Sequence, residues 1–214
     1  PKIYRQFIEV QSLDITKSPM EVAPTAHYSM GGIEINSVNH TTTIEGLFAA
    51  GEVAGGLHGA NRLGGNSLAE ILIFGKIAGS KAAKYSKKLR VHKRSISAIK
   101  KALDRIDNKI NSGKELILPL QKELSLIMCK YCGVVKNSEK LNKGLEKIKE
   151  IKSRVKEVEV RIEDNNYQDL VNIFNLDSAL ITGEATIISA LNRKESRGAH
   201  QRSDYRNTNI DQNV

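Results

Sequence analysis

Residues 51–68 constrain this chain more than any other stretch. They place six glycines, one arginine, one glutamate and one histidine between an apolar run at 47–50 and an apolar helical pattern that starts at Leu68. This order predicts a short strand, a Gly-rich loop and a helix from Ser67 to about Ser86. Glycine lets a backbone approach a bound ligand closely, and a helix N-terminus attracts anions. The layout is typical of a cofactor or anion site, with a tight connection that binds nothing as the alternative.

The side chains of the loop indicate which kind of ligand it would hold. Arg62 can take a carboxylate or a phosphate with two parallel hydrogen bonds. Asn66 or Ser67 can cap the following helix and leave its other N–H groups for a ligand. The spacing excludes a GxxxxGK[ST] phosphate loop, and the chain has no GxGxxG dinucleotide fingerprint. The loop therefore predicts an anion site outside these two nucleotide-binding patterns.

Four motifs resemble one enzyme family. They are PTAHYSMGGI at 24–33, GLFAAGE at 46–52, GGLHGANRLGGNSL at 55–68, and ESRGAH at 195–200 with the later Asp204. Together they closely resemble the flavoprotein subunit of fumarate reductase and succinate dehydrogenase. The resemblance spans most of the chain, and it implies a FAD-dependent oxidoreductase that interconverts fumarate and succinate.

The resemblance also implies which part of such an enzyme this sequence represents. The family's N-terminal dinucleotide fold, the histidine that often carries flavin covalently and the catalytic arginine of the capping domain have no counterpart in the sequence. We therefore expect the C-terminal part of a longer flavoprotein, incomplete and inactive as this chain alone, with no catalytic residue of its own. The missing portion would be an N-terminal FAD-binding portion or a separate chain.

The expected fold class is an α/β flavin-site segment followed by an α-helical bundle. We expect the tail of a capping domain at 1–17, the C-terminal part of a FAD-binding domain at 18–90 and a helical domain at 91–214. The flavin-site segment should contain short strands at 33–35, 41–44 and 47–50. Apolar periodicity predicts the later helices at 95–111, 115–131, 141–162 and 167–192.

By this resemblance, six residues should form the ligand site. His27 and Arg62 match the family's substrate-binding histidine and arginine and would hold a C4-dicarboxylate. Glu52 would contact hydroxyl groups of FAD. The start of the following helix would offer N–H groups to the flavin and stabilise the negative charge of its reduced form. This helix start consists of Asn66, Ser67 and Leu68.

Two other interpretations stay open. L-aspartate oxidase is a related enzyme with a similar pattern, but it commonly carries a cysteine where Met30 stands, and it departs from the Leu63-Gly64-Gly65-Asn66 sequence. A non-catalytic scaffold subunit that needs a separate N-terminal FAD-binding chain also fits. The sequence favours the fumarate and succinate enzymes over both.

Most of the positive charge lies in the second part of the chain. The net charge is +9, and residues 81–214 hold 28 Lys and Arg against 17 Asp and Glu. Acidic residues alternate with the basic ones along helical patterns, and the chain has no Trp and few Phe, which disfavours a nucleic-acid surface. We expect solvated helices, no nucleic-acid partner, and an iron–sulfur subunit as the candidate acidic partner.

The remaining cysteines and histidines are expected to have minor roles. Cys129 and Cys132 should be small buried residues on one helix rather than a zinc or redox pair, and no other metal site is expected. His58 should shape the Gly-rich loop or touch the flavin. Surface or loop positions are expected for His40, His92 and His200.

No apolar run approaches the roughly 20 residues that a transmembrane helix needs. The sequence also lacks the basic and apolar pattern of a signal peptide. We therefore expect a cytoplasmic protein that lies at the inner face of the membrane only through partner subunits.

Overall fold

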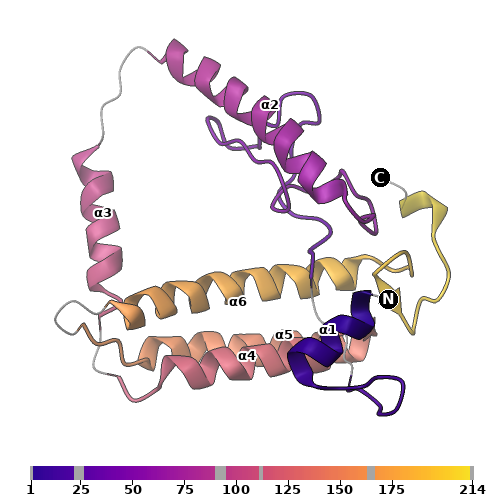
Figure 1. The fold of residues 1–214 in the computed structure, drawn as a ribbon. Coiled ribbons are helices and arrows are strands. Elements are labelled where there is room, and N and C mark those ends of the chain that lie inside the picture. The colour runs from indigo at the N-terminus through magenta and orange to yellow at the C-terminus, as the bar shows by residue number, and fades with distance from the viewer. Residues whose placement is uncertain (1, 22–26, 90–94, 111–112, 163–166, 213–214) are drawn as a thin grey trace.

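The protein is described by a computed structural model that covers residues 2–21, 27–89, 95–110, 113–162 and 167–212. Residues 24–26 of the first motif and His92 lie outside the described residues. The structure is mostly helical, as expected (Figure 1). Its helices are α1 (Lys2–Gln11), α2 (Asn66–Lys88), α3 (Ile96–Asp107), α4 (Ile117–Tyr131), α5 (Ser138–Arg154) and α6 (Gln168–Asn192). Short elements are the strands β1 (Val135–Lys136) and β2 (Gln201–Arg202) and the 3-10 turns η1 (Val155–Glu157) and η2 (Ile210–Gln212).

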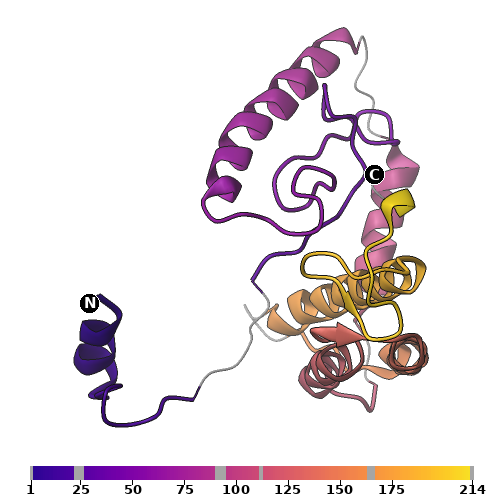
Figure 2. The same ribbon diagram turned by 90° about the vertical axis from the view of Figure 1, so that its right-hand side faces the viewer.

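Helices α4, α5 and α6 lie side by side and form the expected bundle (Figures 1 and 2). Each helix buries one apolar stripe against the other two. Two glycines allow close approach: a Cβ on Gly144 would lie 2.9 Å from the Cβ of Tyr131, and one on Gly183 would lie 3.2 Å from the sulfur of Met128. The buried core consists of Ile117, Leu120, Leu124, Ile127, Leu141, Ile148, Ile151, Val158, Val160, Ile173, Leu176, Leu180, Ile187 and Ala190.

Helix α5 ends at Arg154 instead of continuing to Ile162 as the periodicity predicts. Beyond η1 the chain is extended, and residues 157–159 pair with Glu115 through backbone hydrogen bonds. Val158 and its second neighbour Val160 are both buried. Alternate residues of an extended segment share one face, whereas in a helix they diverge, so extension is what buries both valines.

The segment between α1 and α2 contains isolated bridges where three strands were expected. Ile33 bridges Ala54, and Thr41 bridges Phe48. The expectation of strands at 33–35, 41–44 and 47–50 is therefore wrong for the described residues. A positive φ of 58° at His40 and 81° at Gly46 interrupts the extended chain on both sides of 41–44, so the pairing of Thr41 with Phe48 stops after one residue.

One expectation about side chains is also wrong, and another holds only in part. Cys129 is exposed, because it lies off the apolar stripe of α4, while Cys132 is half-buried where that helix ends. Both thiols are free, and burial raises the pKa of Cys132. His40 lies in a loop, which is one of the two positions expected for it, but it is buried there, with its ring centre 4.9 Å from that of Phe74.

No described helix is long and apolar enough to cross a membrane. Within the same residues, no group of three or more His, Cys, Asp or Glu side chains is placed to hold a metal ion.

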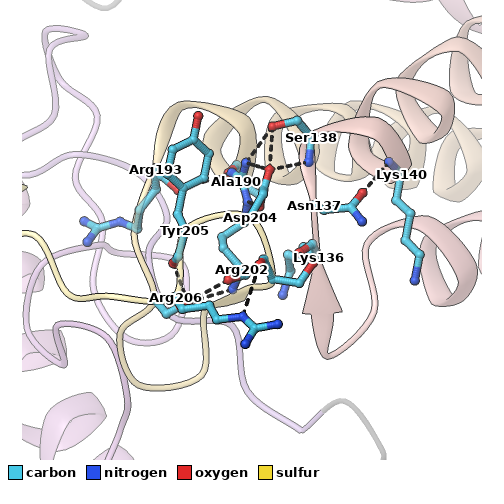
Figure 3. A network of polar contacts seen from close by, with 12 residues as sticks. Lys136, Asn137, Ser138, Lys140, Ala190, Arg193, Arg202, Asp204, Tyr205 and Arg206 are labelled. Carbon is cyan, nitrogen blue, oxygen red and sulfur yellow. Dashed lines mark hydrogen bonds and ion pairs between the residues drawn. The ribbon is translucent and has the colours of Figure 1, made fainter.

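Arg202 ties the chain after α6 to the bundle. Its buried guanidinium donates to Asp204 at 2.8 Å, to the hydroxyl of Ser138 at 2.9 Å and to the carbonyl of Ala190 (Figure 3). Asp204 also accepts the backbone N–H of Ser138 at 2.8 Å. These bonds join the start of α5, the end of α6 and β2, which pairs in parallel with β1. The hydrogen bond from Arg202 is the main reason that the pKa of Asp204 lies well below its ordinary value of 3.8.

The same segment after α6 touches the Gly-rich loop. The backbone N–H of Ala199 donates to the carbonyl of Ala60 at 3.1 Å. Gly198 has a φ of +56°, and a Cβ there would lie 2.5 Å from that carbonyl oxygen. A glycine is therefore required both by the backbone conformation and by the close contact.

We predict that Asp204→Asn destabilises the protein by about 3 kcal/mol at pH 7, because it leaves the Arg202 guanidinium buried without a counter-charge. The native pKa of Asp204 is lowered, so the unfolded state takes up the proton first as the pH falls. The stabilisation is therefore complete above about pH 5 and is lost as the pH drops through and below 3.8. Urea unfolding from pH 7 to pH 3 should show a flatter acid limb in the variant.

The control for this experiment is Asp211→Asn, since Asp211 is exposed on η2. It should change the unfolding free energy by less than about 0.5 kcal/mol. An acid limb in Asp204→Asn that matches the unmodified protein would contradict the prediction.

We also predict that Gly198→Ala costs at least about 1 kcal/mol more stability than Gly59→Ala. Gly59 has nearly the same φ, +53°, but no described atom lies within 4 Å of a Cβ placed there. The two variants therefore share the backbone strain and differ in the clash with Ala60. Urea unfolding of both variants measures the difference. Equal losses of unfolding free energy would show that the backbone at Ala60 moves away from the new methyl group at little cost.

Candidate functional site

A cavity of about 240 Å³ lies at the N-terminal end of α2. Its walls come from the segment before the first bridge, from the Gly-rich loop and from the first turns of α2. Five of the six residues expected at the ligand site line it, while Asn66 is exposed and is not among its lining residues. The lining residues are His27, Tyr28, Glu52, Arg62, Ser67, Leu68, Glu70 and Ile71.

Arg62 is the cation of this cavity. Its Nη2 lies 3.2 Å from Nε2 of His27, and its guanidinium carbon lies 4.5 Å from the ring centre of Tyr28. Because a guanidinium has no acceptor, the contact requires Nε2 of His27 to be the unprotonated nitrogen. The Nη1 group donates to the carbonyl of Leu63 at 3.2 Å. The Nε of Arg62 is buried without a partner among the described residues, so the fork keeps a free donor.

Close backbone packing brings His27 to the loop. Ile33 donates its N–H to Val53 at 2.8 Å, and Gly55 donates to Ile33 at 3.0 Å. Gly32 has a φ of +144°, and a Cβ there would lie 2.3 Å from the carbonyl oxygen of Val53. The Gly31-Gly32 pair after His27 is thus what lets this segment lie against the loop.

Glu52 connects the same two parts of the chain. Its Oε1 accepts the backbone N–H of Ser29 at 2.7 Å. A carboxylate has a second oxygen with its own lone pairs. Glu52 can therefore accept the N–H of Ser29 with one oxygen and a hydrogen bond from a ligand hydroxyl group with the other.

The N-terminus of α2 has no side-chain cap among the described residues, contrary to the expectation from the sequence. Gly65 is the capping residue, with a φ of 85°, and no described side chain caps the helix, so the expected cap by Asn66 or Ser67 is wrong. The first N–H groups of a helix have no intrahelical acceptor, and the first turn of α2 holds no acidic residue. The N–H of Asn66 donates to the carbonyl of Leu63 at 3.3 Å, whereas those of Ser67 and Leu68 remain available to an anionic or carbonyl-bearing ligand. They and Glu52 fit the carbonyl edge and the hydroxyl groups of FAD.

Three residues at this site are not assigned a definite role from the sequence. Tyr28 and Glu70 are missed altogether, and His58 is assigned to loop shape or flavin contact. The buried Glu70 accepts the Tyr28 hydroxyl at 2.9 Å, and its carboxylate also lies 2.8 Å from Nε2 of His58. The available signal is that Glu70 is the one acid in the apolar run from Leu68 to Phe74.

Comparisons with known proteins agree with the motifs. A family model described as the fumarate reductase flavoprotein C-term matches residues 121–214, and an FAD binding domain model matches residues 1–68. An uncharacterized FAD-dependent oxidoreductase of Methanocaldococcus jannaschii is 42% identical over 206 residues, which cover 95% of this chain and 36% of that protein. The succinate dehydrogenase flavoprotein subunit of Rickettsia bellii is 39% identical over 212 residues, which cover 92% of this chain and 35% of that protein.

The fold agrees as well. The solved structure of Mycobacterium smegmatis Sdh1 superposes with a TM-score of 0.91 at 37% identity, covering 98% of this chain and 35% of that one. The chain thus spans about a third of the length of the relatives it matches. On these findings, the chain belongs to the fumarate reductase and succinate dehydrogenase flavoprotein family of oxidoreductases, whose cofactor is FAD.

Proposed function

We propose that this chain supplies the substrate-carboxylate clamp and part of the FAD site of an enzyme that interconverts fumarate and succinate. The observation that carries the proposal is the meeting of Arg62 and His27, 35 residues apart in sequence, in one cavity at the open N-terminus of α2. A dicarboxylate needs a cationic fork and a second donor at a fixed separation. Both side chains are available at this cavity.

Arg62, which lines the cavity, would take one carboxylate through the N–H donors of its guanidinium that are not used within the chain. His27 accepts from Arg62 through Nε2, which leaves Nδ1 as the protonated nitrogen and as a donor to substrate. Binding at both points would hold the substrate in one orientation, which converts the reaction into an effectively unimolecular step.

FAD supplies the hydride chemistry when bound. Glu52 would accept hydroxyl groups of the cofactor, and the first turn formed by Asn66, Ser67 and Leu68 would donate N–H groups to its carbonyl edge. The positive end of the α2 dipole would stabilise negative charge on that edge. Asn66 does not line the cavity and its N–H already donates to the carbonyl of Leu63 at 3.3 Å, so the N–H groups of Ser67 and Leu68 carry this part of the proposal.

We further propose an iron–sulfur subunit as partner and attachment to the membrane through partner subunits. The surface of the bundle carries ion pairs such as Lys143–Glu139 and Lys147–Glu150. Its lysines are thus partly neutralised within the chain, and the remaining positive charge suits an acidic partner. Domain boundaries at 17/18 and 90/91 stay predictions.

We predict that Arg62→Lys in the FAD-loaded enzyme lowers kcat/KM for fumarate by roughly 30- to 150-fold, about 2–3 kcal/mol of transition-state stabilisation. An ammonium group cannot reproduce two parallel hydrogen bonds. Steady-state fumarate reduction with a reduced dye measures the loss. Arg206→Lys is the control, because Arg206 is exposed and, among the described residues, donates only to the carbonyl of Ser203 at 3.4 Å.

Equal kinetics for Arg62→Lys and Arg206→Lys would show that Arg62 is structural and would end the proposal. The same enzyme should be assayed for oxidation of succinate and of L-aspartate. Faster turnover of L-aspartate than of succinate would assign it to L-aspartate oxidase instead.

We predict that Glu52→Gln raises the Kd for FAD about tenfold. The amide oxygen of glutamine can still accept the N–H of Ser29. Its NH₂ group, however, replaces the second carboxylate oxygen, which would accept a hydrogen bond from a hydroxyl group of FAD. Fluorescence titration of the deflavinated enzyme with FAD measures the affinity. The exposed Glu34→Gln variant is the control, and an unchanged Kd in Glu52→Gln would remove Glu52 from the cofactor site.

A further inference from the structure

The buried carboxylate of Glu70 has no task in the function proposed above. Its side chain is 3% exposed, although it stands on α2 beside the ligand cavity. One oxygen, Oε2, accepts from the Tyr28 hydroxyl at 2.9 Å and from Nε2 of His58 at 2.8 Å. An ionised carboxylate only accepts hydrogen bonds, so Nε2 of His58 carries a proton. A buried charge is costly to leave unpaired, so both donors are held to this oxygen.

The two donors belong to the two segments that form the clamp. Tyr28 follows His27 directly, and His58 lies in the Gly-rich loop with Arg62. Their rings meet edge to face with centres 5.6 Å apart, and the guanidinium of Arg62 lies 4.5 Å above the Tyr28 ring centre. Glu70 therefore fixes, from a rigid helix, the aromatic surface on which Arg62 rests.

We propose that Glu70 is a positioning residue for Arg62, acting through Tyr28 and His58 to hold the guanidinium ready for a substrate carboxylate. The inference rests on the proposed function, in which Arg62 binds that carboxylate. Arginine loses considerable rotamer freedom when it is ordered by a ligand. A guanidinium already held on a fixed ring loses less, so the substrate binds more tightly. The negative charge of Glu70 would repel a carboxylate, so its contribution passes through Arg62.

The state of Tyr28 agrees with this role. Burial, and then the hydrogen bond to Glu70, raises the pKa of Tyr28 above its ordinary value of 10. The hydroxyl therefore stays protonated and keeps donating to Glu70 across the working range of the enzyme.

The first test is Glu70→Gln in the FAD-loaded enzyme. The amide of glutamine is close in size to the carboxylate, but it is a weaker hydrogen-bond acceptor. Its NH₂ group would also face two other donors, the Tyr28 hydroxyl and Nε2 of His58. We expect KM for fumarate to rise about tenfold, kcat to change less than about threefold, and the FAD content to stay the same. A residue that only supports the fold would change FAD content and stability instead of KM alone.

The chain offers a matched control in Glu45→Gln. Glu45 accepts the Tyr85 hydroxyl at 3.1 Å, which is the same type of bond at an exposed position outside the cavity. This variant should leave both KM and kcat unchanged. If Glu70→Gln folds poorly or loses FAD, Tyr28→Phe carries the test, because it keeps the ring beneath Arg62 and removes the hydroxyl. It should raise KM in the same direction.

A double-mutant cycle separates this inference from the proposed function. In an Arg62→Lys background, Glu70→Gln should change KM by less than about twofold, because the group that it positions is already gone. Additive effects would overturn the inference, as would an unchanged KM in both Glu70→Gln and Tyr28→Phe. If Arg62→Lys alone has no effect on fumarate kinetics, the proposed function fails instead.

Discussion

The buried guanidinium of Arg202 is the interaction on which the arrangement of this chain depends. A charge with no exposed surface is tolerated only where its donors are satisfied, and these donors reach Asp204, Ser138 and the end of α6. The chain after α6 therefore has one position relative to the bundle. From that position, Ala199 donates to Ala60, two residues before Arg62. One buried charge thus connects the helical bundle to the loop that carries the ligand-binding arginine.

In each half of the structure, a buried carboxylate holds an irregular loop in place. Glu195 is fully buried, accepts from Arg197 at 3.1 Å and from the backbone of Asn209 at 2.8 Å, and its pKa is lowered to about 2, chiefly by Arg197. Glu70 accepts from Tyr28 and His58 at the cavity. In both places an irregular loop takes a fixed shape because its polar groups satisfy a charge that cannot reach water. Loop precision here comes from buried polar contacts more than from an apolar core.

The sequence predicted the parts that depend on local pattern. The bundle helices follow from apolar periodicity, and the cavity residues His27, Arg62 and Glu52 follow from motifs that resemble one family. Periodicity failed beyond Arg154, where burial of alternate valines decides for extended chain, and at the three expected strands, where residues with positive φ interrupt pairing. Glu70 was missed because its role depends on Tyr28, 42 residues away, and such a contact exists only after folding.

The charges around the cavity bear on how a dicarboxylate could bind. Arg62 is the cation among the residues that line it, and the α2 N-terminus adds roughly half a positive charge. Glu52 and Glu70 contribute two negative charges, although Glu70 is compensated by two hydrogen bonds. His27 is a neutral acceptor toward Arg62, so it can donate to a second carboxylate but cannot neutralise it. Under the proposed function, these lining residues hydrogen-bond the second carboxylate without neutralising it, and the catalytic arginine implied by the family resemblance would supply the missing positive charge.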